Sequence, residues 1–182
     1  RLYPLFNKHT MKNFTVKRSK PLVLSNSFLG RVKNTLTGEP DFKGDERYLL
    51  IGNEIHRRVL EPHTAPPDVE FTEDELRVIE GCEEALLATP DVGQMLEDCK
   101  VEQTFTVDYP PIKGIQLTGI IDGDQRHIET GTDLKTTSAR TQAAFLKSRI
   151  KFNYFRQAVI YGYAGCKNFR IIGVSKVNFK TF

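Results

Sequence analysis

Cysteine is scarce in this chain, and its few cysteines are poorly placed for metal binding. The 182 residues include three, Cys82, Cys99 and Cys166, which are far apart, odd in number and in no C-x-x-C pair. Disulfide frameworks and zinc or iron–sulfur sites use paired or clustered cysteines. The sequence therefore predicts an intracellular protein in a reducing compartment and argues against a cysteine-based metal site.

Long apolar runs, repeats and low-complexity segments are also absent. No apolar stretch approaches the roughly 18–20 residues that cross a bilayer, and the first residues lack the apolar core and cleavage site of a signal peptide. We therefore expect no membrane contact and a single domain over residues 1–182, with the basic, weakly patterned residues 1–20 as a loosely held arm. The net charge of +3 permits a polyanionic partner without requiring one.

Helical patterns dominate the first half of the chain. The stretch 21–34 predicts an extended piece and then a short helix capped by Ser25 or Ser27, followed by a loop over 37–45. Three further helices are expected over 46–62, 71–90 and 91–99. The apolar stripe of the first of these is Tyr48, Ile51, Ile55 and Val59; the second has a Thr72–Glu75 capping box and a stripe of Leu76, Ile79, Leu86 and Leu87.

Period-two patterns then predict a sheet. Strands are expected over 101–109, 115–122 and 127–136 in a meander, followed by a helix over 141–165 and a strand over 169–177. This order indicates an α/β domain with a small mixed sheet covered by helices.

A D-x-K pattern lies in the third expected strand. Alternate residues of a strand share a face, so Asp133 and Lys135 point the same way, and Asp122 lies beside Asp133 if the two strands pair. Carboxylates this close repel unless a cation separates them, and a hard divalent metal is the usual solution. Lys135 could then act on a metal-bound water or neutralise charge on a phosphate. The alternative is a surface ion pair, with Asp122 merely in the Gly123-Asp124 turn.

Several motifs accompany this pattern in order. G-x-x-D ends at Asp122, D-L-K-T spans 133–136 and Q-x-x-x-Y spans 157–161, while GNEIHRRVLEP occupies 52–62. Together they resemble the PD-(D/E)XK nuclease superfamily, specifically its RecB-like branch, and are most similar to the RecE-type exonucleases of phages and prophages. The resemblance covers about residues 45–180 and implies a restriction-endonuclease-like core.

The resemblance also implies roles for individual residues. Asp122 and Asp133 would bind Mg²⁺ or Mn²⁺, the backbone carbonyl of Leu134 and the imidazole of His56 would complete the metal shell, and Lys135 would be catalytic. Gln157 and Tyr161, four residues apart on a helix, would lie beside the site near the DNA. Glu102, at the start of the preceding strand, is an additional candidate ligand, whereas Glu61 is expected to brace the helix end.

The polar strand before Asp133 departs from the apolar strand of the family. We therefore expect a bulge at Gly131, with Glu129 reaching the rim of the site because it shares the parity of Asp133.

Basic residues near the motifs are candidate phosphate contacts. They are Arg57, with its neighbour Arg58, on one side, and Arg140, Lys147, Arg149, Lys151 and Arg156, interleaved with Phe152 and Tyr154, on the other. No helix-turn-helix pattern is evident, which favours end-directed or structure-directed cleavage of DNA.

The resemblance therefore predicts a metal-dependent exonuclease that resects duplex ends, in the cytoplasm of a bacterial or phage-infected cell, with a single-strand annealing protein as partner. Two alternatives stay open: an endonuclease or CRISPR-adaptation nuclease on the same fold, and a DNA-binding module whose site has decayed. The four cluster-binding cysteines usual in the adaptation nucleases are missing. An oligomer is compatible with the sequence, although no coiled-coil pattern indicates one.

Overall fold

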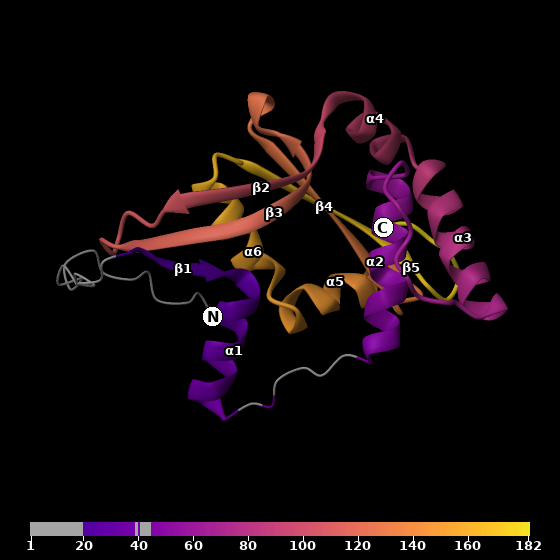
Figure 1. The fold of residues 1–182 in the computed structure, drawn as a ribbon, viewed down its shortest axis with the longest axis horizontal. Coiled ribbons are helices and arrows are strands. Elements are labelled where there is room, and N and C mark those ends of the chain that lie inside the picture. The colour runs from indigo at the N-terminus through magenta and orange to yellow at the C-terminus, as the bar shows by residue number, and fades with distance from the viewer. Residues whose placement is uncertain (1–19, 39, 41–44) are drawn as a thin grey trace.

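A computed structural model describes residues 20–38, 40 and 45–182 (Figure 1). Apart from Lys20, the expected N-terminal arm lies outside the described residues. The described part is mixed α/β: six helices flank a five-stranded mixed sheet, as the sequence predicts. Within it, every helix is too short or too polar to cross a bilayer.

The sheet is organised around its longest strand. The strands are β1 (Leu22–Ser25), β2 (Lys100–Asp108), β3 (Ile115–Gln125), β4 (Thr130–Thr137) and β5 (Asn168–Ser175). β2 pairs antiparallel with β3 along one edge, and β5 pairs parallel with β4. The other edge of β3 is shared: β1 pairs parallel with residues 115–118, and β4 pairs antiparallel with residues 123–125. Residues 119–122 of β3 therefore lie where β1 has ended and β4 has diverged.

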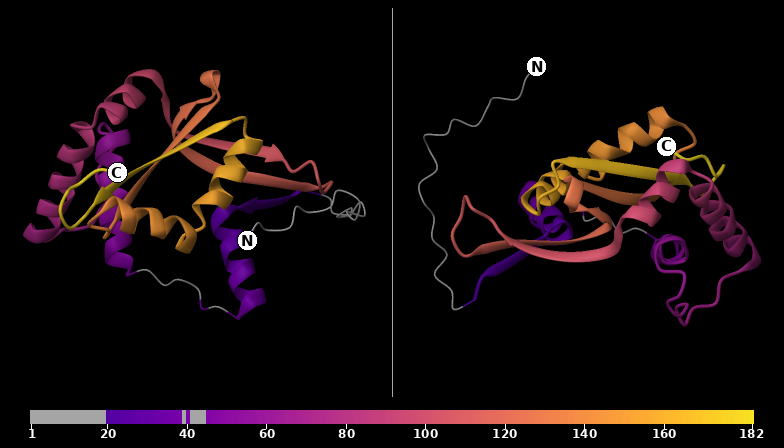
Figure 2. Two further views of the ribbon diagram at one scale, coloured as in Figure 1. Left: turned by 180° about the vertical axis from the view of Figure 1, so that it is seen from behind. Right: turned by 90° about the horizontal axis from the view of Figure 1, so that it is seen from above.

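Helices cover the sheet in two groups. They are α1 (Asn26–Thr37), α2 (Glu46–Leu60), α3 (Glu73–Leu87), α4 (Pro90–Asp98), α5 (Gln142–Lys151) and α6 (Tyr154–Tyr163). Figure 2 shows α5 and α6 together on one side of the strands, and α2 and α3 side by side at the end of the molecule opposite the β2–β3 turn.

Two hydrophobic clusters hold these groups to the sheet. In the first, Ile55 of α2 and Ile79 of α3 pack with Leu134 of β4. In the second, Phe105 of β2 and Ile121 of β3 pack with Ile160 of α6. The central residues of β3 and β4 thus run between two separately packed cores, because α2 and α6 are anchored on different parts of the sheet.

The helices expected in the first half of the chain are confirmed, with two differences in their apolar faces. Ser25 is the N-cap of α1, and the Thr72–Glu75 capping box is formed. Ile51, Ile55 and Val59 are buried, but Tyr48 is 61% exposed, because its ring lies at the surface beneath Lys176, whose Nζ is 4.8 Å from the ring centroid. The prediction for Leu87 is also wrong: it is exposed at the last residue of α3.

The hairpin between β3 and β4 differs from the prediction. β3 continues through Asp124 and Gln125, so Asp122 is inside a strand and not in a turn. Residues Arg126–Ile128 form a 3₁₀ turn, and Glu129 follows with a positive φ of 58°. Glu129 therefore lies at the hairpin tip, 2.5 Å from Lys167 Nζ, and does not reach the site.

Glycine is required at position 131 because Cys166 approaches the strand closely there, and not because the strand bulges. The β3–β4 and β4–β5 registers run without interruption past it, so the expected bulge is wrong. A Cβ at this position would lie 2.9 Å from Cys166 Sγ. Glycine lets the loop after α6 pack directly on the strand.

The expected helix over 141–165 is two helices. Asn153 adopts the left-handed conformation, with φ 54° and ψ 41°, and interrupts the helix, which separates α5 from α6. Asparagine tolerates this region better than most residues, which is why apolar periodicity on either side did not reveal the break. The break turns α6 so that it can contact β3.

Candidate active site

Strand divergence places two carboxylates beside each other. Continuing the β3–β4 register puts Asp122 opposite Asp133, but the strands separate at this point. The Leu134 N–H, instead of joining the ladder to β3, donates to Asp122 Oδ2 at 2.7 Å. Both acids are nearly inaccessible, at 7% and 1% exposure. The fold therefore keeps two buried acids in a gap between strands, where side chains take the place of ladder hydrogen bonds.

A series of side-chain hydrogen bonds connects Asp133 to α6. Lys135 is ion-paired with Asp133 Oδ2, and Gln157 Nε2 donates to Asp133 Oδ1 at 2.6 Å and to the Tyr161 hydroxyl at 3.0 Å. The Tyr161 hydroxyl in turn donates to the Ile120 carbonyl on β3. The predicted lysine, glutamine and tyrosine are thus brought together around one carboxylate. They fix its orientation from two sides.

His56 reaches the same gap from α2. Its Nδ1 lies 3.7 Å from Asp122 Oδ2. Gly52, one turn earlier, permits this approach, since a Cβ there would lie 3.0 Å from Thr136 Oγ1 on β4. The predicted proximity of His56 to Asp122 is confirmed.

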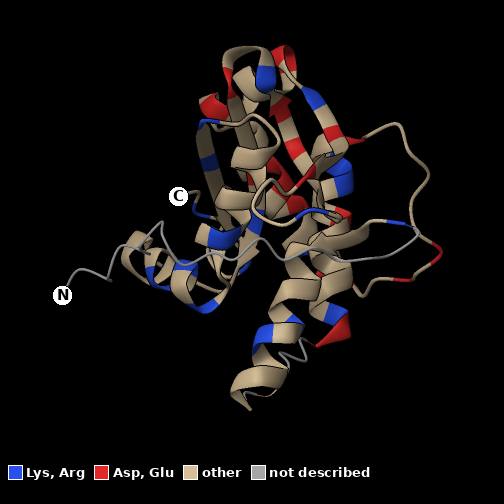
Figure 3. Cartoon of the chain, turned by 90° about the vertical axis from the view of Figure 1, so that its left-hand side faces the viewer, with Lys and Arg blue, Asp and Glu red and all other residues tan. Residues whose placement is uncertain are grey.

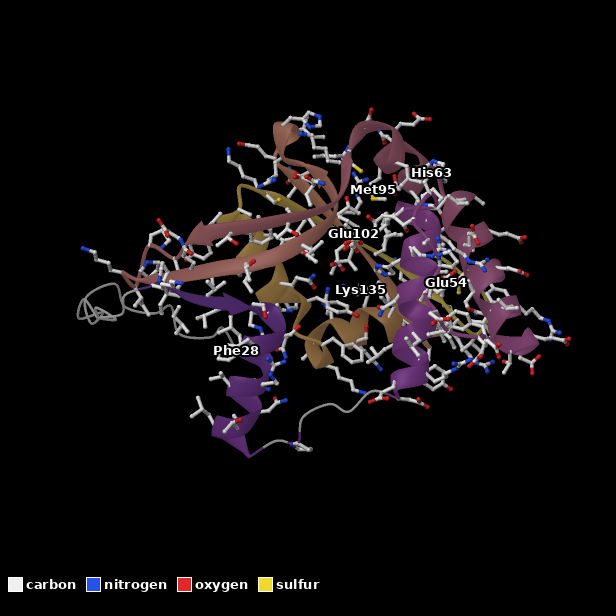
Figure 4. The ribbon with its side chains drawn as sticks, viewed as in Figure 1. Phe28, Glu54, His63, Met95, Glu102 and Lys135 are labelled. Carbon is white, nitrogen blue, oxygen red and sulfur yellow. The ribbon has the colours of Figure 1, made fainter. Side chains whose placement is uncertain are left out.

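Glu102 completes a group of three possible metal ligands. One atom each of His56, Glu102 and Asp122 lie within 4.8 Å of one another. Glu102 lies opposite Asp122 on β2, between the pairs Val101–Gly123 and Gln103–Ile121, and has a positive φ of 49°. Figure 4 shows Glu102 and Lys135 directed into the region between β3 and α2. The sequence named Glu102 only as an additional candidate, because its strand position alone did not place it opposite Asp122.

Asp133 does not belong to that group of three. Its Oδ1 accepts from Gln157 and its Oδ2 is paired with Lys135. The three side chains that the structure brings within 4.8 Å of one another are His56, Asp122 and the additional candidate Glu102. The role of Asp133 and of the Leu134 carbonyl as ligands stays a prediction.

The cluster holds three acids and one ammonium, and burial disfavours the charged form of two of those acids. Burial, reinforced by the neighbouring Asp133, raises the pKa of Asp122 to about 8. Burial and the nearby Glu61 and Asp133 also raise the pKa of Glu102. Although burial opposes it, the pKa of Lys135 is raised by the carboxylates of Asp133 and Asp122. Burial and the Lys135 charge lower the pKa of His56 to about 4. The imidazole is therefore a neutral donor at physiological pH.

These residues fit a divalent ion of the Mg²⁺ or Mn²⁺ class. Carboxylate oxygens suit both ions, and one neutral imidazole nitrogen suits Mn²⁺ in particular. A cation here would favour the charged form of Asp122, which burial and the neighbouring Asp133 disfavour.

The predicted DNA-contacting residues divide into two sets. Arg140, Lys147, Arg149 and Lys151 are exposed. The guanidinium of Arg57, in contrast, donates to both oxygens of Glu54 and to the Thr64 carbonyl, and that of Arg156 to the side chain and carbonyl of Asn26. The structure gives Arg57 and Arg156 protein partners, and their contact with DNA stays a prediction.

A charge asymmetry supports the first set. Residues 134–182 contain ten of the chain's 26 Lys and Arg residues and none of its 23 Asp and Glu residues. Asp133 is thus the last acid in the sequence. Figure 3 shows acidic segments on the strands at the centre and basic segments on the helices around them. The sequence reasoning missed this asymmetry because net charge conceals it.

Comparison of the sequence with protein-family models gives no match. Comparison with curated proteins gives no significant match.

Proposed function

We propose that this chain is a metal-dependent deoxyribonuclease. The observation that carries the proposal is the convergence of Asp122, Asp133 and Lys135 with Gln157 and His56, from four elements, in one gap of the sheet. Three acids, counting Glu102, with a neutral imidazole and an ammonium form an arrangement suited to metal-assisted phosphodiester hydrolysis.

His56, Glu102 and Asp122 would hold Mg²⁺ or Mn²⁺, which when bound supplies charge neutralisation at the phosphate and lowers the pKa of water. Lys135 has a raised pKa and stays protonated, so it acts as a positive charge toward the phosphate and not as a base. Gln157 holds Asp133 in the position where it can orient this ammonium.

Exonucleolytic resection of duplex ends is the form we propose, on the resemblance to RecE-type exonucleases. On the same resemblance we propose a single-strand annealing protein as partner. The proposed location is the cytoplasm of a bacterial or phage-infected cell. The acid-free, basic stretch over residues 134–182 supports attraction of a polyanion in all cases.

The test is digestion of linear and covalently closed circular duplex DNA in Mg²⁺ or Mn²⁺, with EDTA and Lys135→Ala as controls. We expect degradation of the linear form only. Cutting of both forms would replace the exonuclease with an endonuclease. Binding of DNA without cutting in either metal would contradict the proposal and leave a binding module.

A further inference from the structure

A hollow next to the site is not used by the chemistry above. It lies between α5, α6 and β5, measures about 300 Å³, and has walls that include Phe145, Leu146, Arg149, Tyr154, Phe155 and Phe169. This volume is at the small end for ligand pockets and suits one planar ring system.

The floor of the hollow is rigid. Phe145 is 6% exposed and stacks on Phe182 with 5.5 Å between ring centroids. Its ring presses on β5 at Gly173, where a Cβ would lie 2.6 Å from it. Tyr154, also buried, packs beside it at 6.5 Å. A floor of fixed aromatic rings is prepared for stacking, since no side chain needs to be ordered when a ligand arrives.

The rim, in contrast, is exposed and both apolar and cationic. Phe155 is 61% and Leu146 45% exposed. The guanidinium of Arg149 lies over the Phe155 ring, 5.4 Å from its centroid, and Lys147 is exposed on the same helix. Neither α5 nor α6 contains an acidic residue. Aromatic faces combined with an arginine plane and cations form the arrangement on which unpaired bases stack while their phosphates are neutralised.

Tyr154 joins this hollow to the candidate active site. It lines the hollow, and Lys135 Nζ lies 5.9 Å from the centroid of its ring. A base in the hollow and a phosphate at Lys135 would therefore belong to nearby nucleotides of one strand.

We infer that the hollow between α5 and α6 binds the base of an unpaired nucleotide of the strand whose phosphate lies at Lys135. The inference rests on the proposed function for the choice of DNA as ligand. It goes beyond that function by assigning a base-stacking subsite to named residues, and it requires that the strand be single-stranded where it enters the site, because a base pair does not fit.

The probe is a short single-stranded oligodeoxynucleotide carrying 2-aminopurine, whose fluorescence is quenched by stacking. Binding is measured in EDTA, so that cleavage is neither needed nor possible. Phe155→Ala should weaken binding by roughly 5- to 150-fold, the range for loss of one base–aromatic stack, and should reduce the quenching. Val159→Ala is the matched control: it is 60% exposed on the same helix and does not line the hollow.

An abasic nucleotide sharpens the assignment. Moved along the strand, it should weaken binding to the wild-type protein at one position only. At that position it should cause no further loss in Phe155→Ala, because ring and base form one interaction. Both substituted residues are exposed at the surface. Melting temperatures equal to that of the wild-type protein would confirm that both variants fold.

Equal binding by Phe155→Ala and Val159→Ala, or by abasic and intact strands, would overturn the inference. So would a Phe155→Ala variant that binds DNA normally but loses self-association in sedimentation, since the hollow would then be a protein contact. The proposed function fails separately: a wild-type protein that shows the Phe155-dependent quenching but cleaves no DNA in Mg²⁺ or Mn²⁺ retains the base subsite and loses the nuclease assignment.

Discussion

Two buried acidic clusters lie on opposite sides of α2, and their charge balance differs. Glu54 faces α3, whereas the His56 side faces the strands, and Figure 4 places Glu54 and Lys135 on either side of this helix. Glu54 is 3% exposed and accepts hydrogen bonds from Arg57 and Arg58. Asp122, 7% exposed, has one backbone donor and a neighbouring carboxylate.

The protein shifts the pKa values of Glu54 and Asp122 in opposite directions. Hydrogen bonding by Arg57 lowers the pKa of Glu54, whereas burial raises that of Asp122. A compensated acid stabilises the fold; an acid kept in excess of its counter-charges costs stability and is prepared to receive a cation. We infer that the Glu54 cluster secures α2, and that the Asp122 cluster is the site of the proposed chemistry.

Removing the ammonium that is paired with Asp133 should have the largest effect. Lys135→Ala should lower cleavage by about 10²–10⁴-fold, because it removes the positive charge directed at the phosphate. Metal binding should stay intact, because the candidate ligands His56, Glu102 and Asp122 are unchanged. Single-turnover assays and calorimetric titration of Mn²⁺ measure the two properties. Lys167→Ala, which removes an exposed lysine paired with Glu129 at the hairpin tip, should change neither. Near-wild-type turnover of Lys135→Ala would remove Lys135 from the chemistry.

Asp133→Ala should also abolish cleavage, but for a different reason. The variant leaves Lys135 and Gln157 without their shared acceptor, and if Asp133 is also a ligand it should weaken Mn²⁺ binding. Unchanged Mn²⁺ affinity in the same titration would restrict Asp133 to orienting Lys135, as its present contacts indicate.

A substitution in the Glu54 cluster should change the stability of the protein and not its activity. Glu54→Gln should lower the free energy of unfolding by about 3 kcal/mol, since it leaves two guanidinium groups without their buried counter-charge. Urea unfolding measures this loss, and the folded fraction should cleave at the wild-type rate. Glu83→Gln is the control, because Glu83 is 27% exposed and pairs with Arg58 through one oxygen; it should cost less than about 1 kcal/mol.

His56→Ala tests whether α2 contributes to the metal site. We expect at least the roughly tenfold loss of activity that removal of even an outer partner of a metal causes, and a greater loss in Mg²⁺ than in Mn²⁺. Because the pKa of His56 is lowered to about 4, protonation of this residue should not weaken metal binding near pH 6.5, as the ordinary histidine pKa would predict. Equal losses in both metals would argue against a ligand role.

The smallest effect is a gain in stability. Asp122→Asn should abolish cleavage in Mg²⁺ or Mn²⁺. In EDTA it should raise the free energy of unfolding by about 1 kcal/mol, since a neutral amide replaces a carboxyl group that burial makes costly to ionise. From pH 6.5 to about 8 the unfolded chain has released the Asp122 proton and the native chain holds it, so wild-type stability should fall as pH rises, by at most about 1.4 kcal/mol per unit. The variant should lack this slope. A destabilised variant would place Asp122 with Glu54 as a structural acid.

Much of the fold could be read from local signals. The Thr72–Glu75 capping box and the stripe of Ile51, Ile55 and Val59 fix α3 and α2, because caps and apolar spacing act within a few residues. The break at Asn153 and the extension of β3 to Gln125 could not be read in this way. Both depend on contacts with distant elements, namely packing of α6 on β3 and pairing of β3 with β4.

The candidate site shows the same division. The sequence by itself determined the residue types and the shared face of Asp133 and Lys135, because alternation along a strand is a local property. Only the tertiary structure decided that Glu102 lies opposite Asp122, that Gln157 binds Asp133, and that Arg57 is held by Glu54. Strand register and helix placement bring together groups that are far apart in the chain. No local sequence pattern determines which of two nearby acids is paired with a lysine or arginine side chain.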